Sequence, residues 1–184
     1  MTTKLKRISR PKNLLLPAFF LAFLIIAGCA PAGTTVPRGW SGGAIADSTL
    51  FIGSMDGKLV ALNTADGKTV GNDVPLETSS TVVIYGSPVV AGELVYLGGY
   101  IITSRPGGEG KFYAFVWGRD EPRWVYPRQG TVDGSIVGGS VVAQDKVFFG
   151  AANGNVYALD AADGFKVWIF PTGNKIWSTP AILD

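Results

Sequence analysis

Few residues of this 184-residue chain have side chains that commonly carry chemistry. The chain contains no His and a single Cys. The lack of His removes the commonest acid–base group and metal ligand, and one Cys cannot form an internal disulfide or a Cys-based zinc site. Several acidic residues lie at predicted turns, where Asp bonds to the backbone: Asp56, Asp66, Asp133, Asp160 and Asp163. We therefore expect no catalytic residues, no metal site and no bound cofactor.

The single Cys, Cys29, follows a targeting segment. A basic start without acidic residues leads into 14 apolar residues, from Leu14 to Ala27, and Gly28 precedes the Cys. The run is short for a membrane span, which needs about 20 residues, and it matches the core of a signal peptide. Its end resembles a bacterial lipobox, so residues 1–28 are predicted to be a lipoprotein signal peptide and Cys29 to carry lipid. The alternative is an uncleaved N-terminal anchor, and both place the rest outside the cytoplasm.

The charge balance changes once this segment is removed. It holds five of the 16 basic residues and none of the 14 acidic ones, which leaves a net charge of −3. That balance gives no argument for nucleic-acid binding. Residues 29–38 are predicted to be a flexible tether, because small residues and prolines cannot build a core. Ala30 after Cys29 favours the periplasmic face of the outer membrane in a two-membrane cell; otherwise we expect the outer leaflet of the cytoplasmic membrane.

Beyond the tether the chain repeats itself. The segment GKLVALNTADGKTV, from Gly57, aligns without a gap with GNVYALDAADGFKVW, from Gly154, at an offset of 97 residues. A third copy lies between them, with KFYAF from Lys111. The repeated glycines are Gly53, Gly57, Gly98, Gly150, Gly154 and Gly164. An internal repeat of this length sets the architecture.

Each repeat predicts four short antiparallel strands. In the third copy these are residues 141–143, 146–150, 155–160 and 166–170, and Asn153-Gly154 predicts a two-residue turn with both residues at positive φ. Repeats start at residues 40, 85, 137 and 177, a spacing typical of propeller blades. The predicted fold is an all-β propeller in residues 39–184. Its blades span about 40–84, 85–136 and 137–176, and a fourth starts at 177–184.

Matching tryptophans add to the repeat, and the second repeat departs from it in two segments. Trp124 and Trp168 match each other in the fourth strands and are expected to pack between blades. In the second repeat, a longer loop at residues 99–110 replaces the turn before the third strand, and WGRDEP from Trp117 replaces the usual corner. Such loops often make specific contacts. The candidate interaction residues are Tyr100, Arg105, Glu109, Trp117 and Arg119, and the alternative is a tolerated surface insertion.

The repeats resemble those of the pyrroloquinoline quinone (PQQ)-like propeller superfamily. The resemblance rests on GSPVV from Gly86, LFIGSMDG from Leu50, VYALDAADG from Val156 and FKVW from Phe165. Its lipid-anchored relatives resemble the accessory lipoprotein of the outer-membrane β-barrel assembly machine. That implies a non-catalytic scaffold for envelope proteins, held to the membrane through lipid on Cys29.

The same resemblance leaves two alternatives open. One is a fragment of a PQQ-dependent alcohol or sugar dehydrogenase, which would bind PQQ and Ca²⁺ at the propeller axis. Many such enzymes place two adjacent cysteines beside the quinone, and this chain has only Cys29. The other is a ligand-binding or sensor lipoprotein. Fold alone does not decide among them.

The number of repeats also predicts an incomplete ring. Propellers close at about four to eight blades, and an open arc would expose apolar faces and a strand edge. We therefore expect the chain to be part of a longer product, with self-association to complete a ring as the alternative.

We expect the protein from its source cells to begin at Cys29 and to carry diacylglycerol on that residue. Intact-mass spectrometry measures chain length and lipidation together. A lipidated mass about twofold larger would point to further blades. An unmodified mass that still includes residues 1–28 would contradict the lipobox interpretation.

Overall fold

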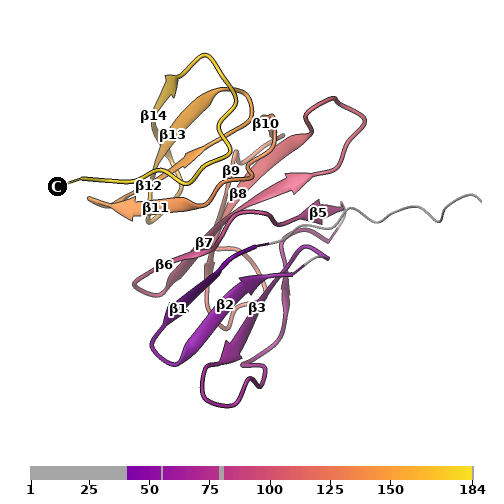
Figure 1. Cartoon of the computed structure of the whole chain (residues 1–184), viewed down its shortest axis with the longest axis vertical. Coiled ribbons are helices and arrows are strands. Elements are labelled where there is room, and N and C mark those ends of the chain that lie inside the picture. Colours follow the sequence, from indigo (N-terminus) through magenta and orange to yellow (C-terminus); the bar gives the residue numbers. More distant parts are fainter. Residues whose placement is uncertain (1–40, 55, 79–80, 184) are drawn as a thin grey trace, which may run out of the picture. The chain divides into compact units, whose positions relative to one another are not determined.

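The three repeats fold into three antiparallel sheets of short strands, as Figure 1 shows. The structure is a computed structural model and describes residues 41–54, 56–78 and 81–183. The predicted signal peptide, the predicted lipidation site Cys29 and the predicted tether lie outside these residues. Within the described part every regular element is a strand, so no helix there could cross a bilayer.

Each repeat forms four strands in chain order, and the second sheet has two further strands. The first contains β1 (Gly43–Ala46), β2 (Thr49–Gly53), β3 (Lys58–Asn63) and β4 (Val74–Pro75). The second contains β6 (Val89–Ala91), β7 (Leu94–Ile101), β8 (Glu109–Val116) and β9 (Trp124–Tyr126), and is extended by β5 (Val82–Val83) and β10 (Val132–Asp133). The third contains β11 (Ser140–Ala143), β12 (Lys146–Gly150), β13 (Asn155–Asp160) and β14 (Lys166–Pro171). The strands predicted for the third repeat are confirmed, with one-residue extensions of β11 and β14.

The first strand of each sheet lies innermost. Strand β6 contacts both β1 and β11, so the three sheets meet along these strands. The residues just after the start of each repeat are small where the sheets meet. A Cβ on Gly86, for example, would overlap the carbonyl of Gly138. Ser41 donates a hydrogen bond of 2.9 Å from Oγ to the Gly86 carbonyl. Sheets that meet along their innermost strands make a propeller arc, which confirms the predicted all-β fold.

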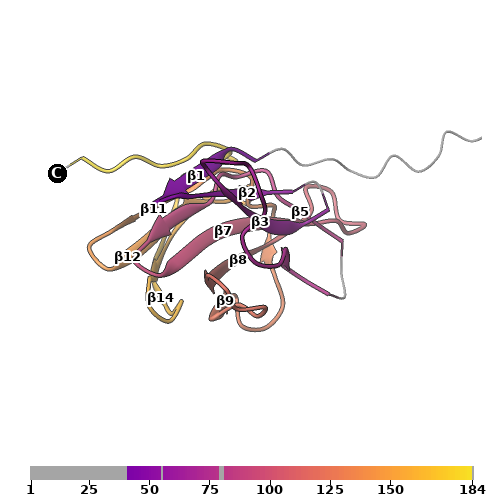
Figure 2. The same ribbon diagram turned by 90° about the horizontal axis from the view of Figure 1, so that it is seen from below.

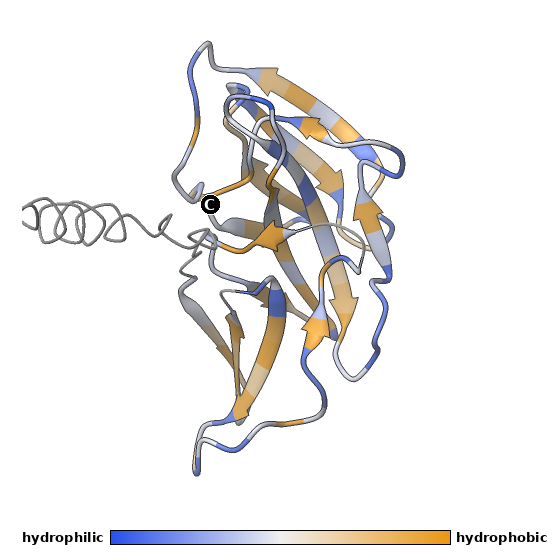
Figure 3. Cartoon of the chain, turned by 90° about the vertical axis from the view of Figure 1, so that its right-hand side faces the viewer, coloured by the Kyte–Doolittle hydropathy of each residue, from blue (hydrophilic) through white to orange (hydrophobic). Residues whose placement is uncertain are grey.

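Two apolar layers hold the sheets together. One lies between the first and second sheets and the other between the second and third, each built from alternate residues of both sheets. Apolar residues therefore dominate the strands and polar residues the loops, as Figure 3 shows. The layers include large, fully buried rings, such as Phe112 stacked on Phe149 with centroids 4.2 Å apart.

Three repeated glycines have a reason that the sequence alone did not reveal. A Cβ on Gly53, Gly98 or Gly150 would overlap the Cγ2 methyl of Ile84, Ile136 or Ile176 respectively. Each isoleucine comes from the segment that leads into the following repeat. Glycine at the fifth residue of each second strand therefore lets the connection pass closely over the sheet.

The turn predicted at Asn153-Gly154 forms differently from expectation. It has four residues, 151–154, closed by hydrogen bonds from Gly154 N–H to the Ala151 carbonyl and from Ala151 N–H to the Asn155 carbonyl. Only Gly154 has a positive φ, of 83°, and the prediction that Asn153 shares it was wrong. The Asn153 side chain explains its place, because its Oδ1 accepts from Asn155 N–H and its Nδ2 donates to the Tyr157 hydroxyl.

The corners between third and fourth strands show why Asp and Asn occur there. In the third sheet, Asp160 Oδ1 accepts from Ala162 N–H at 2.8 Å, and Asp163 Oδ1 accepts from Phe165 N–H at 3.0 Å. Asn63 and Asp66 make the same bonds in the first sheet. These side chains form turns with their own backbone, as predicted for Asp66, Asp160 and Asp163. Asp56 instead bonds to the side chains of Ser54 and Lys58. Asp133 differs, because it lies in β10.

Gly154→Val should lower the free energy of unfolding by about 1–3 kcal/mol, because it forces a β-branched residue to positive φ. Urea unfolding measures the change. Ala65→Val, at an exposed turn residue with ordinary φ, is the matched control and should change stability little. Equal midpoints for the two variants would contradict this account of the turn.

Candidate functional site

The second sheet carries a long hairpin that the other sheets lack. Strands β7 and β8 continue beyond the length of their counterparts, so only residues 102–108 form the loop. The predicted loop at 99–110 was therefore too long. Strand β5 pairs with the end of β7, and β10 pairs with the start of β8. Figure 2 shows strands β7 and β8 of this hairpin from below. Because both edges are bonded, the hairpin is a rigid projection.

The hairpin tip is tied down by side chains. Arg105 Nε lies 3.2 Å from Glu109 Oε1, and Thr131 Oγ1 donates to Glu109 Oε2 at 2.8 Å. Gly108 N–H donates to the Arg105 carbonyl. The Tyr100 ring covers Gly108, where any Cβ would overlap it. The exposed arginine therefore has an ion-pair partner within the hairpin, at the end of a supported strand pair.

A partly buried polar cluster lies at the base of the hairpin. Glu77, from the connection between the first two sheets, has Oε1 2.7 Å from Lys111 Nζ and 3.0 Å from the Tyr113 hydroxyl. Burial raises the pKa of the Tyr113 hydroxyl far above its usual range, and the charge of Glu77 adds to that rise. The hydroxyl therefore stays protonated and donates to the carboxylate. The cluster ties the connection to β8.

The five candidate interaction residues do not gather in one place. Tyr100, Arg105 and Glu109 belong to the hairpin end, whereas Trp117 and Arg119 follow β8 at its opposite end. Trp117 is half-buried and packs edge-on against Phe51, with ring centroids 5.0 Å apart. Sequence reasoning missed Glu77, because its partners come from another repeat.

The fourth strand of the first sheet lacks the tryptophan found in the other two sheets, and Trp117 fills the space instead. The N–H groups of Val70 and Arg123 donate to the matching carbonyls of Ala61 and Ala114, so Gly71 stands where the second sheet has Trp124. A Cβ on Gly71 would lie 3.5 Å from Cζ2 of Trp117. The indole at this interface comes from the following sheet, which explains the altered corner at Trp117.

Trp124 packs between the second and third sheets. It is 7% exposed, and its Nε1 donates to the Ala161 carbonyl at 3.1 Å. The face of its ring lies against Gly164, where a Cβ would come within 2.5 Å of Cε3. Tyr96 donates to the same carbonyl from its hydroxyl. The turn between β13 and β14 of the third sheet therefore binds the indole of Trp124 from the preceding sheet.

The described residues offer no cluster of carboxylates of the kind that binds Ca²⁺. A shallow cavity of about 260 Å³ lies among the innermost segments, lined by Tyr85, Ser87, Val137, Trp177 and Thr179 with neighbouring glycines. It contains no carboxylate, whereas Ca²⁺ takes six or more oxygens, partly from carboxylates. No three Asp, Glu or Cys side chains converge anywhere in the described ranges.

Three sheets meet along their innermost strands, and glycines allow close packing between them. This arrangement defines a β-propeller of PQQ-like repeats. The family model of the outer membrane protein assembly factor BamB, named PQQ_2, matches residues 30–170. The chain belongs to this family. A comparison with curated protein sequences finds no match.

Solved structures share the fold at low sequence identity. BamB from Moraxella catarrhalis is 23% identical with a TM-score of 0.56, and the match covers 77% of this chain and 42% of that one. The quinohemoprotein alcohol dehydrogenase from Comamonas testosteroni is 18% identical with a TM-score of 0.59, over 73% and 28%. Sqt1 from Saccharomyces cerevisiae is 15% identical with a TM-score of 0.59, over 76% and 38%. The chain therefore spans less than half the length of each.

Tyr113→Phe should flatten the loss of stability at high pH. Above a pH of about 10, an unfolded chain releases the tyrosine proton while the folded protein keeps it, so stability falls as pH rises. Without this hydroxyl the slope should become shallower by up to about 1.4 kcal/mol per pH unit. Urea unfolding between neutral and strongly alkaline pH measures it. Identical slopes for both proteins would contradict the burial of the hydroxyl beside Glu77.

Proposed function

We propose that this protein is a non-catalytic interaction scaffold of the cell envelope, anchored by lipid on Cys29. Its family membership supports a role of the outer-membrane assembly type, and the supported hairpin of the second sheet carries the residue-level proposal. The hairpin end combines an exposed Arg105, Pro106 at the tip and the Tyr85–Tyr100 ring pair, with centroids 6.1 Å apart. Arginine and tyrosine are enriched where proteins bind one another.

Rigidity is the physical reason for choosing this element. A loop that is already ordered loses little conformational entropy on binding. Strands β5 and β10 and the bonds of Glu109 hold residues 102–108 before any partner arrives. The proposed partner is an envelope protein with a carboxylate for Arg105 and an apolar surface for the tyrosines. No cofactor takes part.

In-cell photocrosslinking tests the contact. A photoreactive amino acid at Ser104, an exposed tip residue, should crosslink to an outer-membrane assembly protein of the source cell. The same amino acid at Glu93, at the opposite end of β7, should not. Equal crosslinking at both positions, or none at Ser104, would contradict the proposal.

Arg105→Ala should lower the yield of the Ser104 crosslink several-fold, because it removes the cation and frees the tip from Glu109. Arg119→Ala is the matched control, since Arg119 is exposed at the other end of the sheet. The quantity compared is the crosslinked fraction at equal protein levels. Equal losses in the two variants would remove Arg105 from the contact.

A further inference from the structure

Two exposed arginines, Arg123 and Arg128, flank β9, the fourth strand of the second repeat. Four other basic side chains of the described residues form ion pairs with carboxylates: Lys58, Lys68, Arg105 and Lys111. Within the same described ranges, neither Arg123 nor Arg128 joins such a pair. Both guanidinium groups therefore carry a positive charge that no described carboxylate balances by direct contact.

The two guanidinium groups turn instead toward the corner between β13 and β14. Arg123 Nε donates to the Ala162 carbonyl, and Arg128 Nη2 donates to the Asp163 carbonyl, each at 3.4 Å. These distances are longer than the usual range of about 2.7–3.2 Å, so the two bonds are weak. A guanidinium carries several N–H donors in a planar fork, and most of them remain available to a ligand.

An aromatic ring supports the second guanidinium. The Cζ atom of Arg128 lies 4.1 Å from the centroid of the Phe165 ring, within the range of cation–π attraction. The ring is 58% exposed, so it borders the surface and does not bury the charge. The contact restricts the guanidinium on one side and leaves its other side open. A side chain that is already restricted loses less conformational entropy when it binds a partner.

The two arginines line an open cavity between the second and third sheets. Its volume is about 630 Å³, and its other lining residues are Trp124, Val125, Ala162 and Asp163. The carboxylate of Asp163 is engaged in the corner, because its Oδ1 accepts from Phe165 N–H at 3.0 Å. Two guanidinium groups and one carboxylate leave a single net positive charge in the lining. All strands of both flanking repeats are present in the described residues.

We infer that this cavity binds the carboxylate of an aspartate or glutamate side chain from a partner protein. One negative charge balances the lining, whereas a doubly charged phosphate would leave an excess of negative charge beside Asp163. The planar fork of arginine also matches the two oxygens of a carboxylate. Small-molecule sites enclose most of their ligand, whereas an open cavity covers only one side of its occupant. The occupant is therefore a side chain whose other side is covered by its own protein.

The cavity is separate from the hairpin of the second sheet. Arg123 N–H donates to the Ala114 carbonyl, near the end of β8 that is opposite to the hairpin tip at residues 102–108. The corner between β13 and β14 belongs to the third sheet, which contributes nothing to that tip. The carboxylate site therefore does not rest on the contact proposed for the hairpin.

Saturation-transfer NMR with the purified full chain tests the site. The probe is the peptide acetyl-Gly-Val-Asp-Val-Gly-amide, and the matched control peptide has Asn in place of Asp. We expect saturation transfer to the valine methyls of the Asp peptide, much less to those of the Asn peptide, and weaker binding at higher salt concentration. Equal transfer to the two peptides, or none to either, would overturn the inference. This comparison uses the unmodified protein, so it does not depend on how any variant folds.

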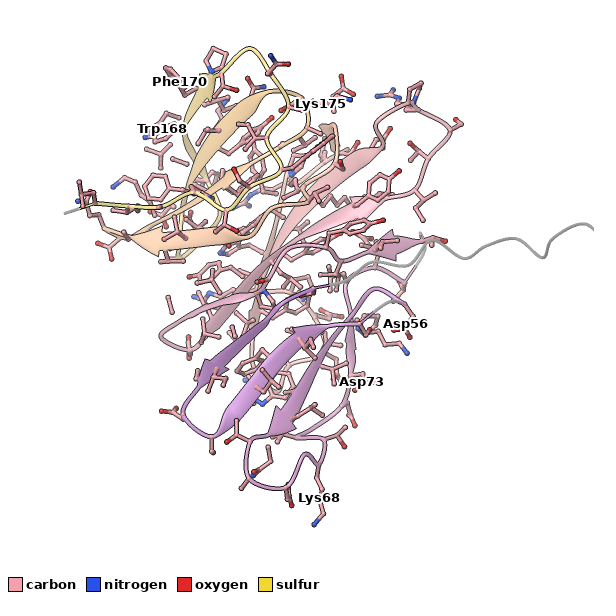
Figure 4. All side chains as sticks on the ribbon, in the orientation of Figure 1. Asp56, Lys68, Asp73, Trp168, Phe170 and Lys175 are labelled. Atoms are coloured by element: carbon pink, nitrogen blue, oxygen red, sulfur yellow. The ribbon has the colours of Figure 1, made fainter. Side chains whose placement is uncertain are left out.

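Arg123→Gln and Arg128→Gln should each raise the dissociation constant of the Asp peptide about two- to fivefold, as expected for an exposed ion pair. Lys68→Gln is the control, because it removes the same charge from the corner of the first sheet, apart from β13 and β14, as Figure 4 shows. It should leave the dissociation constant unchanged. An equal rise in all three variants would show a response to net charge alone and would overturn the site.

Discussion

The close approach of one sheet to the next is the constraint on which the rest of the fold depends. A connection carrying Ile84, Ile136 or Ile176 passes over the fifth residue of each second strand, and only glycine there leaves room for it. The alanines Ala61, Ala114 and Ala158 have the same effect at the centre of each third strand, where large rings from the neighbouring strands need space. Small residues at fixed positions thus let large ones interdigitate.

Local rules account for the features that the sequence predicts correctly. Strand alternation and the Asp-Gly corners depend on neighbours within a few residues, so the order of the amino acids is enough to predict them. The repeat is visible in the sequence directly. The hairpin of the second sheet differs, because its length is set by β5 and β10, which come from connections on either side. Asn153 shows a smaller failure of the same kind, since hydrogen bonds to Asn155 and Tyr157 favour a four-residue turn.

The site residues follow the same division. Glu77 pairs with Lys111 and Tyr113 across more than 30 positions, and nothing in the repeat marks it. Trp117 belongs by its sequence to a variable corner, yet its indole fills the gap left by Gly71. The differences between repeats are therefore of two kinds. One kind, such as Trp117, fills a gap in the packing between sheets. The other, the hairpin of the second sheet, extends beyond that packing.

The exchange between Gly71 and Trp117 makes the order of the units matter. Each of the two described interfaces contains a single indole, which comes from the following sheet in one and from the preceding sheet in the other. A first unit joined directly to a third would bring Gly71 to Gly164 with no indole between them. A second unit followed by another second unit would bring Trp124 and Trp117 into the same space. The repeats are therefore not interchangeable modules, and recombination among them would be limited to exchanges that keep one indole at every junction.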